Sequence, residues 1–220
     1  MDKIAFIFDW DGVIVDSSDL HRRSWEELAN ELGKVLPPNH FHLGFGKRNE
    51  TIIPEILNWS NDEKLIEQWG KRKEEIYRKL GQSDGIQMQK GAFQFLQSAN
   101  ATGLACAIGT STEKKNVFLA IEQHGLGAFF KAIVSSEDVK HGKPDPEVFL
   151  KASKLLKTSP TKCVVIEDSA HGIEAAKTGG MRTVALTTSH PEETFRPLEP
   201  DLILSDLGSV SIENILNIFP

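Results

Sequence analysis

The hydrophobic pattern divides the chain into an apolar strand, a helical stretch, and then an alternation of strands and helices. The first strand is predicted at Lys3–Phe8, an apolar run without a helical stripe, which is typical of a strand buried on both faces. Five further apolar runs predict strands at Leu104–Ile108, Ala132–Val134, Lys162–Ile166, Thr183–Leu186 and Leu202–Leu204. Amphipathic segments separate these runs, so we expect an α/β fold with a Rossmann-like, doubly wound parallel sheet.

The stretch between the first strand and this alternation shows only helical periodicity. Its longest predicted helix runs from Asn61 to Leu80, and Ser60 and Glu63 form a capping-box pattern at its start. The expected domains are an α/β core of residues 1–17 and 87–220 and an all-α domain of residues 18–86 inserted into it.

Two aspartates, Asp9 and Asp11, follow the first strand directly, and their spacing places both carboxylates on one side. The ligand crevice of an open α/β sheet lies at this end of the strands. Paired carboxylates are costly unless a cation lies between them, and an oxygen-only site suits Mg²⁺. A bare Asp-x-Asp also fits two solvated loop residues. The buried strand, Gly12 and the second apolar run Val13–Val15 favour the metal site.

Three other loops that follow or precede predicted strands carry candidate residues. Thr110 and Ser111 follow the second strand, and their hydroxyl and N–H groups are suited either to phosphate oxygens or to helix capping. Lys143 lies in a loop stiffened by two prolines, which favours a fixed cation over a solvated surface lysine. Glu167 and Asp168 form a second acidic pair after a buried strand.

In this order, the four groups resemble the four motifs of the haloacid dehalogenase (HAD) superfamily. The resemblance implies that Asp9 is a nucleophile and Asp11 a general acid/base. It implies that Thr110, the Ser111 N–H and Lys143 hold phosphoryl oxygens. The implied Mg²⁺ ligands are Asp9, the Asp11 backbone carbonyl, Asp168 and Glu167, with direct ligation by Glu167 left open. The aspartate at position 11 favours phosphoryl chemistry over carbon–halogen cleavage.

A helical cap inserted after the first motif is similar to the β-phosphoglucomutase-like branch, which also contains sugar-phosphate phosphatases. This resemblance implies that His21, Arg48 and Lys73 contact the substrate, together with Ser111. A solvated helix face is the alternative for the Lys71–Lys73 run.

Two departures from the mutase pattern put mutase activity in doubt. Arg48 stands one place before the position of the branch's cap arginine, which is Asn49 here. Glu113-Lys114 replaces a lysine-asparagine pair.

Composition narrows the possible partners and the compartment. The chain has 220 residues and a net charge of −6, which argues against nucleic acid and anionic membrane surfaces. No apolar run approaches a membrane span and no secretory leader is recognisable. Cys106 and Cys163 lie in predicted strands, so we expect no disulfide and a cytoplasmic location. We also expect a monomer.

The leading expectation is a Mg²⁺-dependent phosphatase that hydrolyses a small phosphorylated metabolite, such as a sugar phosphate, through an aspartyl-phosphate. One alternative is a phosphohexomutase of the β-phosphoglucomutase type. Another is a catalytically silent HAD-fold protein with a binding or regulatory role.

Overall fold

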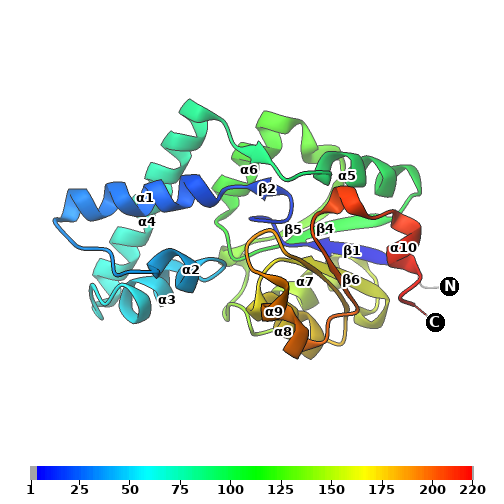
Figure 1. The fold of residues 1–220 in the computed structure, drawn as a ribbon. Coiled ribbons are helices and arrows are strands. Elements are labelled where there is room, and N and C mark those ends of the chain that lie inside the picture. Colours follow the sequence, from blue (N-terminus) through cyan, green and yellow to red (C-terminus); the bar gives the residue numbers. More distant parts are fainter. Residues whose placement is uncertain (1–3, 220) are drawn as a thin grey trace.

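The computed structural model describes residues 4–219, which form a six-stranded sheet and a two-stranded one (Figure 1). The large sheet has the order β5-β4-β1-β6-β7-β8, and every pair in it is parallel. Its strands are β1 (Ala5–Phe8), β4 (Ala105–Gly109), β5 (Phe130–Val134), β6 (Cys163–Glu167), β7 (Arg182–Leu186) and β8 (Leu202–Leu204). The predicted parallel α/β sheet is confirmed. Lys3, which we included in the first strand, lies outside the described residues.

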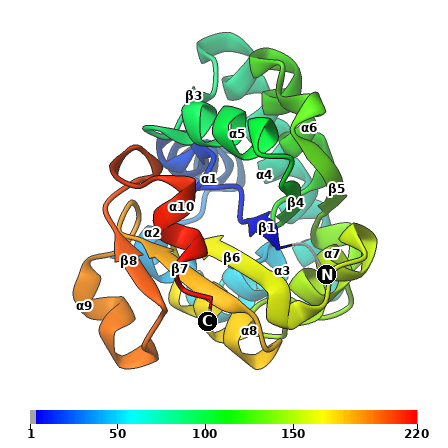
Figure 2. The same cartoon turned by 90° about the vertical axis from the view of Figure 1, so that its right-hand side faces the viewer.

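Strand β1 lies at the centre of the large sheet, and its alternate side chains enter two different helical layers. Phe6 and Phe8 pack in the cluster that contains side chains of α5, α6 and α10, whereas Ala5 and Ile7 pack with those of α7 and α8. Figure 2 shows α5 and α10 on one face of the sheet and α7 and α8 on the other. The helices are α5 (Ala92–Ala101), α6 (Lys114–His124), α7 (Glu147–Leu156), α8 (Ala170–Thr178), α9 (Glu192–Phe195) and α10 (Ile212–Leu216). Burial on both faces explains why β1 reads as a continuous apolar run.

The second unit is a helical insert, the name used here for residues 18–86. It consists of α1 (Ser18–Leu32), α2 (His40–Gly44), α3 (Asn49–Thr51), a π-helical turn (Ile52–Ile56) and α4 (Glu63–Asp84). Helices α1 and α4 pack against each other beside the large sheet (Figure 1). The chain enters and leaves through β2 (Val15–Asp16) and β3 (Gln87–Met88), which pair antiparallel. Two-residue strands are too short to show an alternation of polar and apolar residues, so this ribbon could not be predicted from the sequence.

The predicted capping box at the start of α4 is wrong. Asp62 is the N-cap, and its carboxylate accepts hydrogen bonds from the N–H groups of Lys64 and Leu65, at 2.8 and 3.2 Å. The Ser60 hydroxyl accepts only from the N–H of Asp62. Asp62 lies two residues closer to the helix than Ser60, and its charged carboxylate takes the capping role.

Two further expectations can be compared with the structure. Cys106 and Cys163 are both buried and free, which confirms the prediction of no disulfide. Among residues 4–219, no helix has the length and apolar character needed to cross a membrane.

Candidate active site

The candidate residues meet at the carboxyl ends of the central strands. Asp9 follows β1, and its N–H donates to the carbonyl of Ile166 on β6, at 2.9 Å. Thr110 follows β4, and its N–H donates to the carbonyl of Val134 on β5, at 3.0 Å. A cavity of about 400 Å³ opens there between the sheet and the helical insert. Because parallel strands end at one edge, motifs far apart in sequence line one cavity.

A buried lysine links two of the predicted acidic residues. The Nζ atom of Lys143 lies 2.9 Å from Asp9 Oδ1 and 2.6 Å from Glu167 Oε1, and its side chain is only 2% exposed. Burial lowers the pKa of Lys143, but the carboxylates of Asp9 and Glu167 outweigh burial and raise it. Glu167 Oε2 also accepts the N–H groups of Asp168 and Ser169, at 2.8 and 2.7 Å. Lys143 therefore remains a fixed cation beside Asp9.

Three carboxylates in this region have the arrangement of a cation site. Oxygen atoms of Asp9, Glu167 and Asp168 lie within 4.8 Å of one another, and all three residues are buried. Burial raises the pKa of Asp9 to about 7, with Lys143 opposing and Glu167 reinforcing the effect. Burial and the neighbouring carboxylates Glu167 and Asp9 also raise the pKa of Asp168. One lysine does not balance three buried carboxylates, so these residues fit a hard divalent cation such as Mg²⁺.

Two glycines make room for these carboxylates. A Cβ on Gly12 would lie 1.7 Å from Asp168 Oδ2, and Gly12 has a φ of +75°. A Cβ on Gly172 would lie 1.8 Å from Glu167 Oε1. Neither position tolerates a side chain without displacing a carboxylate of the cluster.

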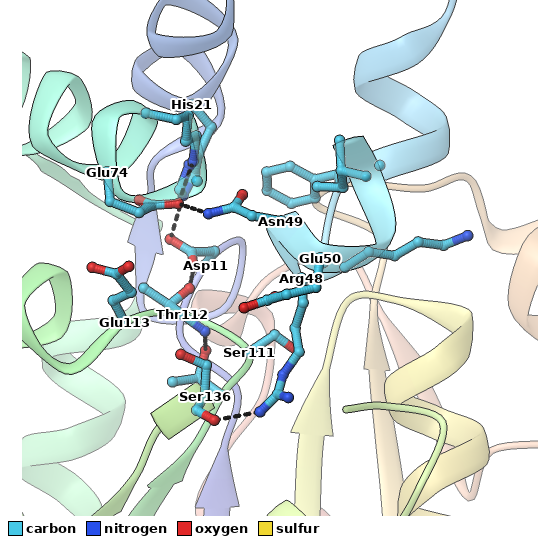
Figure 3. A pocket seen from close by; sticks show the side chains of 18 of the residues that line it. Asp11, His21, Arg48, Asn49, Glu50, Glu74, Ser111, Thr112, Glu113 and Ser136 are labelled. Atoms are coloured by element: carbon cyan, nitrogen blue, oxygen red, sulfur yellow. Dashed lines mark hydrogen bonds and ion pairs between the residues drawn. The ribbon is translucent and has the colours of Figure 1, made fainter. Parts of the chain in front are cut away.

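Asp11 lies two residues from Asp9 in a different environment. Its carboxylate accepts a hydrogen bond from the hydroxyl of Ser17. It also accepts from the hydroxyl of Thr112, and His21 Nε2 lies 3.4 Å from Oδ1 (Figure 3). Burial raises the pKa of Asp11, but His21 and the three hydrogen bonds outweigh burial and lower it to about 2. Asp11 is therefore ionised in this structure. The Thr112 contact was not predicted, although Thr112 belongs to the same turn as Thr110.

His21 is oriented by a lysine of α4. Lys73 Nζ lies 2.6 Å from His21 Nδ1, and the Lys73 side chain is only 3% exposed. An ammonium group has no lone pair to accept with, so Nδ1 accepts and Nε2 carries the hydrogen that points to Asp11. The His21 ring stacks on Tyr77, with centroids 4.3 Å apart. For Lys73, the solvated alternative is wrong; Lys71 is exposed and pairs with Glu67.

A buried glutamate joins the helical insert to the core, and the sequence did not reveal it. Glu74 accepts from Lys73 Nζ at 2.9 Å, from Asn49 Nδ2 at 2.8 Å and from Asn116 Nδ2 at 2.6 Å. Asn116 lies on α6 of the core. Figure 3 shows Glu74 and Asn49 directed toward each other at the wall of the cavity. A glutamate on a helix with many charged residues gives no signal of burial in the sequence.

The remaining predicted contacts lie on the same cavity. Thr110 and Ser111 both line it, and Thr110 Oγ1 accepts the N–H of Thr112 at 3.1 Å. Arg48 also lines the cavity, but its Nη2 donates to the backbone carbonyls of Ser136 and Val139. The predicted core residues and His21, Arg48 and Lys73 are thus brought to one region, where their roles in substrate binding stay predictions.

Proteins of known name share the sequence and the fold of this chain. A family model described as haloacid dehalogenase-like hydrolase matches residues 6–186. The chloroplastic 5-amino-6-(5-phospho-D-ribitylamino)uracil phosphatase of Arabidopsis thaliana is 37% identical over 212 residues, which cover 95% of this chain but only 56% of the relative. Hexitol phosphatase A of Escherichia coli (strain K12) is 30% identical over 208 residues, 94% of this chain and 93% of that protein.

A solved structure has the same architecture. The crystal structure of β-phosphoglucomutase from Clostridium difficile gives a TM-score of 0.86 at 24% identity, covering 98% of this chain and 96% of that one. At this level of identity, the likeness establishes the fold of the chain.

Proposed function

The chain belongs to the haloacid dehalogenase-like hydrolase family, and from this we propose that it is a Mg²⁺-dependent phosphatase acting on a small phosphorylated metabolite, a sugar phosphate. One observation carries the proposal. The buried Asp9 carboxylate contacts Lys143 and adjoins Glu167 and Asp168, on a cavity that Asp11 also lines. A nucleophile, a fixed cation, a cation site and an acid/base are the parts that phosphoryl transfer requires.

The proposed reaction has two displacements at phosphorus. Asp9 attacks in line, the bond between phosphorus and the sugar oxygen breaks, and Asp11 gives that oxygen a proton. Water then attacks the aspartyl-phosphate and gives a proton to Asp11, so that inorganic phosphate leaves and the Asp9 carboxylate is restored. Lys143, Thr110 and the Ser111 N–H hold the phosphoryl oxygens during both steps, and this positioning supplies much of the rate.

Asp9, Asp168 and the backbone carbonyl of Asp11 would hold a Mg²⁺ ion, and that ion would neutralise charge on the phosphoryl group and on the nucleophile. Glu167 already accepts from Lys143 and from two backbone N–H groups, so its main contribution is to hold that lysine and the turn after β6.

The proposed role of Asp11 requires its carboxyl group to change its protonation state during the reaction. Asp11 is ionised before substrate binds, since its pKa is lowered to about 2, and this suits the step in which it takes a proton from water. The negative charge of a phosphate ester raises the pKa of a nearby carboxyl group. The proposed first step therefore requires Asp11 to take up a proton, from solvent or from the monoanionic ester, as the substrate binds.

The charges of the cavity favour hydrolysis over the mutase reaction, which must hold a second phosphate. Four lysine or arginine residues of the insert line the cavity, and three of them, all except Lys47, already have partners. Lys73 contacts His21 and Glu74, Lys71 pairs with Glu67, and Arg48 donates to two backbone carbonyls. Five glutamates line the cavity, namely Glu50, Glu67, Glu74, Glu113 and Glu137. These features support a substrate whose remainder is neutral and rich in hydroxyl groups.

A matched set of phosphate esters tests the proposal. Phosphate release is measured with glucose 6-phosphate, glucosamine 6-phosphate and 6-phosphogluconate, each with Mg²⁺ and with EDTA. Away from the phosphate, the first carries no charge, the second an ammonium group and the third, an open-chain acid, a carboxylate. We expect Mg²⁺-dependent release, absent in Asp9→Asn, with 6-phosphogluconate the poorest of the three. A properly folded Asp9→Asn protein with near-normal turnover would disprove the nucleophile.

The mutase alternative is tested with β-glucose 1-phosphate and a primer of glucose 1,6-bisphosphate. Glucose 6-phosphate is detected through coupled NADPH formation. We expect little glucose 6-phosphate to form. Fast NADPH formation with little phosphate release would establish the mutase reaction instead.

A further inference from the structure

Arg48 connects the helical insert to a loop of the core. It precedes α3, and its backbone carbonyl accepts from the N–H groups of Thr51 and Ile52, at 3.0 and 2.9 Å, so its place in the insert is fixed. Its Nη2 atom donates to the carbonyls of Ser136 and Val139, the second at 3.2 Å (Figure 3). One guanidinium nitrogen therefore joins two backbone oxygens of the loop that follows β5.

The same side chain lies against the residue that precedes the catalytic lysine. A Cβ on Gly142 would lie 2.9 Å from Arg48 Cδ and 3.1 Å from Arg48 Nε, so there is no space for a side chain between them. Lys143 follows at once, with its Nζ beside Asp9 and Glu167. The name Lys143 loop is used here for residues 135–146, which Arg48 contacts at three places.

On the core side, α7 holds the Lys143 loop. Glu147 Oε2 accepts the N–H groups of Lys140 and His141, at 2.8 and 3.0 Å. Lys151 Nζ donates to the carbonyl of Asp138 at 2.6 Å. The loop therefore lies between α7 and Arg48, with the insert supplying one side of its support.

We propose that Arg48 is a positioning residue: when the insert lies over the cavity, Arg48 holds the Lys143 loop where Lys143 reaches Asp9. This inference rests on the proposed phosphatase function. It differs from the substrate contact expected from the sequence, because both hydrogen bonds of Nη2 go to the protein's own backbone. Position 48 thus couples the placement of the insert to the placement of the lysine.

The two roles are separated by the chemistry of the leaving group. An aryl phosphate and a sugar phosphate both need Lys143, whereas only the sugar offers hydroxyl groups with which a substrate-binding Arg48 could form hydrogen bonds. We expect Arg48→Ala to lower kcat/KM by about 10- to 100-fold, and by the same factor for both substrates, as displaced catalytic groups do. Arg72→Ala is the control, since Arg72 is exposed on α4 and pairs with Glu31; we expect no change. A loss confined to the sugar phosphate, or no loss, would overturn the proposal.

A double-mutant cycle tests the contact with Gly142. We expect Gly142→Ala alone to displace Arg48 and to lower the activity, and to cost nothing further in the Arg48→Ala protein, where the space is free. Losses that multiply in the double variant would contradict the proposal. Circular dichroism establishes that each variant is folded.

A binding measurement keeps this inference separate from the proposed function. The affinity for inorganic phosphate with Mg²⁺, measured by calorimetry, needs Lys143 in place but no turnover. If the wild type releases no phosphate from any ester, the proposed function fails. The positioning role is then judged by phosphate affinity alone: weaker binding in Arg48→Ala supports it, and unchanged binding refutes it.

Discussion

Replacing Asp9, the proposed nucleophile, tests the charges of the residues around it as well as its role in the reaction. Asp9→Asn removes one negative charge and preserves the shape of the side chain. In the metal-free protein, burial raises the pKa of Asp9 from 3.8 to about 7, against the opposing effect of Lys143 and with that of Glu167. At about 1.4 kcal/mol for each pKa unit, this shift means that the folded protein disfavours the charged form of Asp9 by about 4 kcal/mol relative to the unfolded chain.

The sign of the effect follows from proton linkage. A carboxyl group with a raised native pKa binds its proton more tightly in the folded chain, so the free energy of unfolding falls as the pH rises from about 4 to about 7. Asparagine does not titrate. Between about pH 5 and about pH 8 in EDTA, we expect the stability of Asp9→Asn relative to wild type to increase by about 2 to 3 kcal/mol. Titration of the histidines is common to both proteins and cancels in the difference.

In the presence of Mg²⁺, we expect the wild type to be more stable than Asp9→Asn. Mg²⁺ binds the folded wild type and stabilises it by mass action, whereas Asp9→Asn lacks one carboxylate ligand. Urea unfolding followed by tryptophan fluorescence measures both proteins in EDTA and in Mg²⁺. If the stability of Asp9→Asn relative to wild type does not increase at the higher pH in EDTA, the attraction of Lys143 for the Asp9 carboxylate outweighs the effect of burial on its pKa. If that increase persists in saturating Mg²⁺, Asp9 is not a metal ligand.

Three further predictions concern the acid/base, the metal site and His21. Asp11→Asn should slow reaction with sugar phosphates by about 10²–10⁴-fold, because only a poor leaving group needs the proton; equal losses for aryl phosphates in single-turnover measurements would contradict this role. Gly12→Ala should displace the carboxylate of Asp168, a proposed metal ligand, so Mg²⁺ should no longer raise the melting temperature in a thermal-shift assay. Lys73→Met should lower kcat by about 10-fold by releasing His21, whereas Lys79→Met on the exposed face of α4 should leave it unchanged.

The sequence predicted the elements that the parallel sheet brings together. Candidate residues after predicted strands, such as Asp9, Thr110 and Asp168, needed only the strand ends to be located, because a parallel sheet places those ends at one edge. Strand β1 was readable because burial on both faces requires an unbroken apolar run.

Contacts between the helical insert and the core could not be predicted in the same way. Arg48 binds backbone carbonyls, which every residue provides, so no pattern of side chains marks its partners. Glu74 and Asn116 meet only because α4 and α6 pack together, 42 positions apart in the chain. Their burial depends on the placement of two helices, and neither helix shows in its own sequence that a polar residue will be enclosed.

Asp9 and Asp11 differ in the parts of the molecule that surround them. Asp9 is surrounded by core groups, and its burial, opposed by Lys143 and reinforced by Glu167, raises its pKa to about 7. Asp11 faces His21 of the insert, which lowers its pKa and which Lys73, also of the insert, holds in one tautomer. Environments that separate two pKa values fit the different roles proposed for the two carboxylates. Both depend on the insert: His21 contacts Asp11 directly, and Arg48 contacts the loop whose Lys143 lies beside Asp9. Movement of the insert is therefore expected to change the surroundings of both carboxylates.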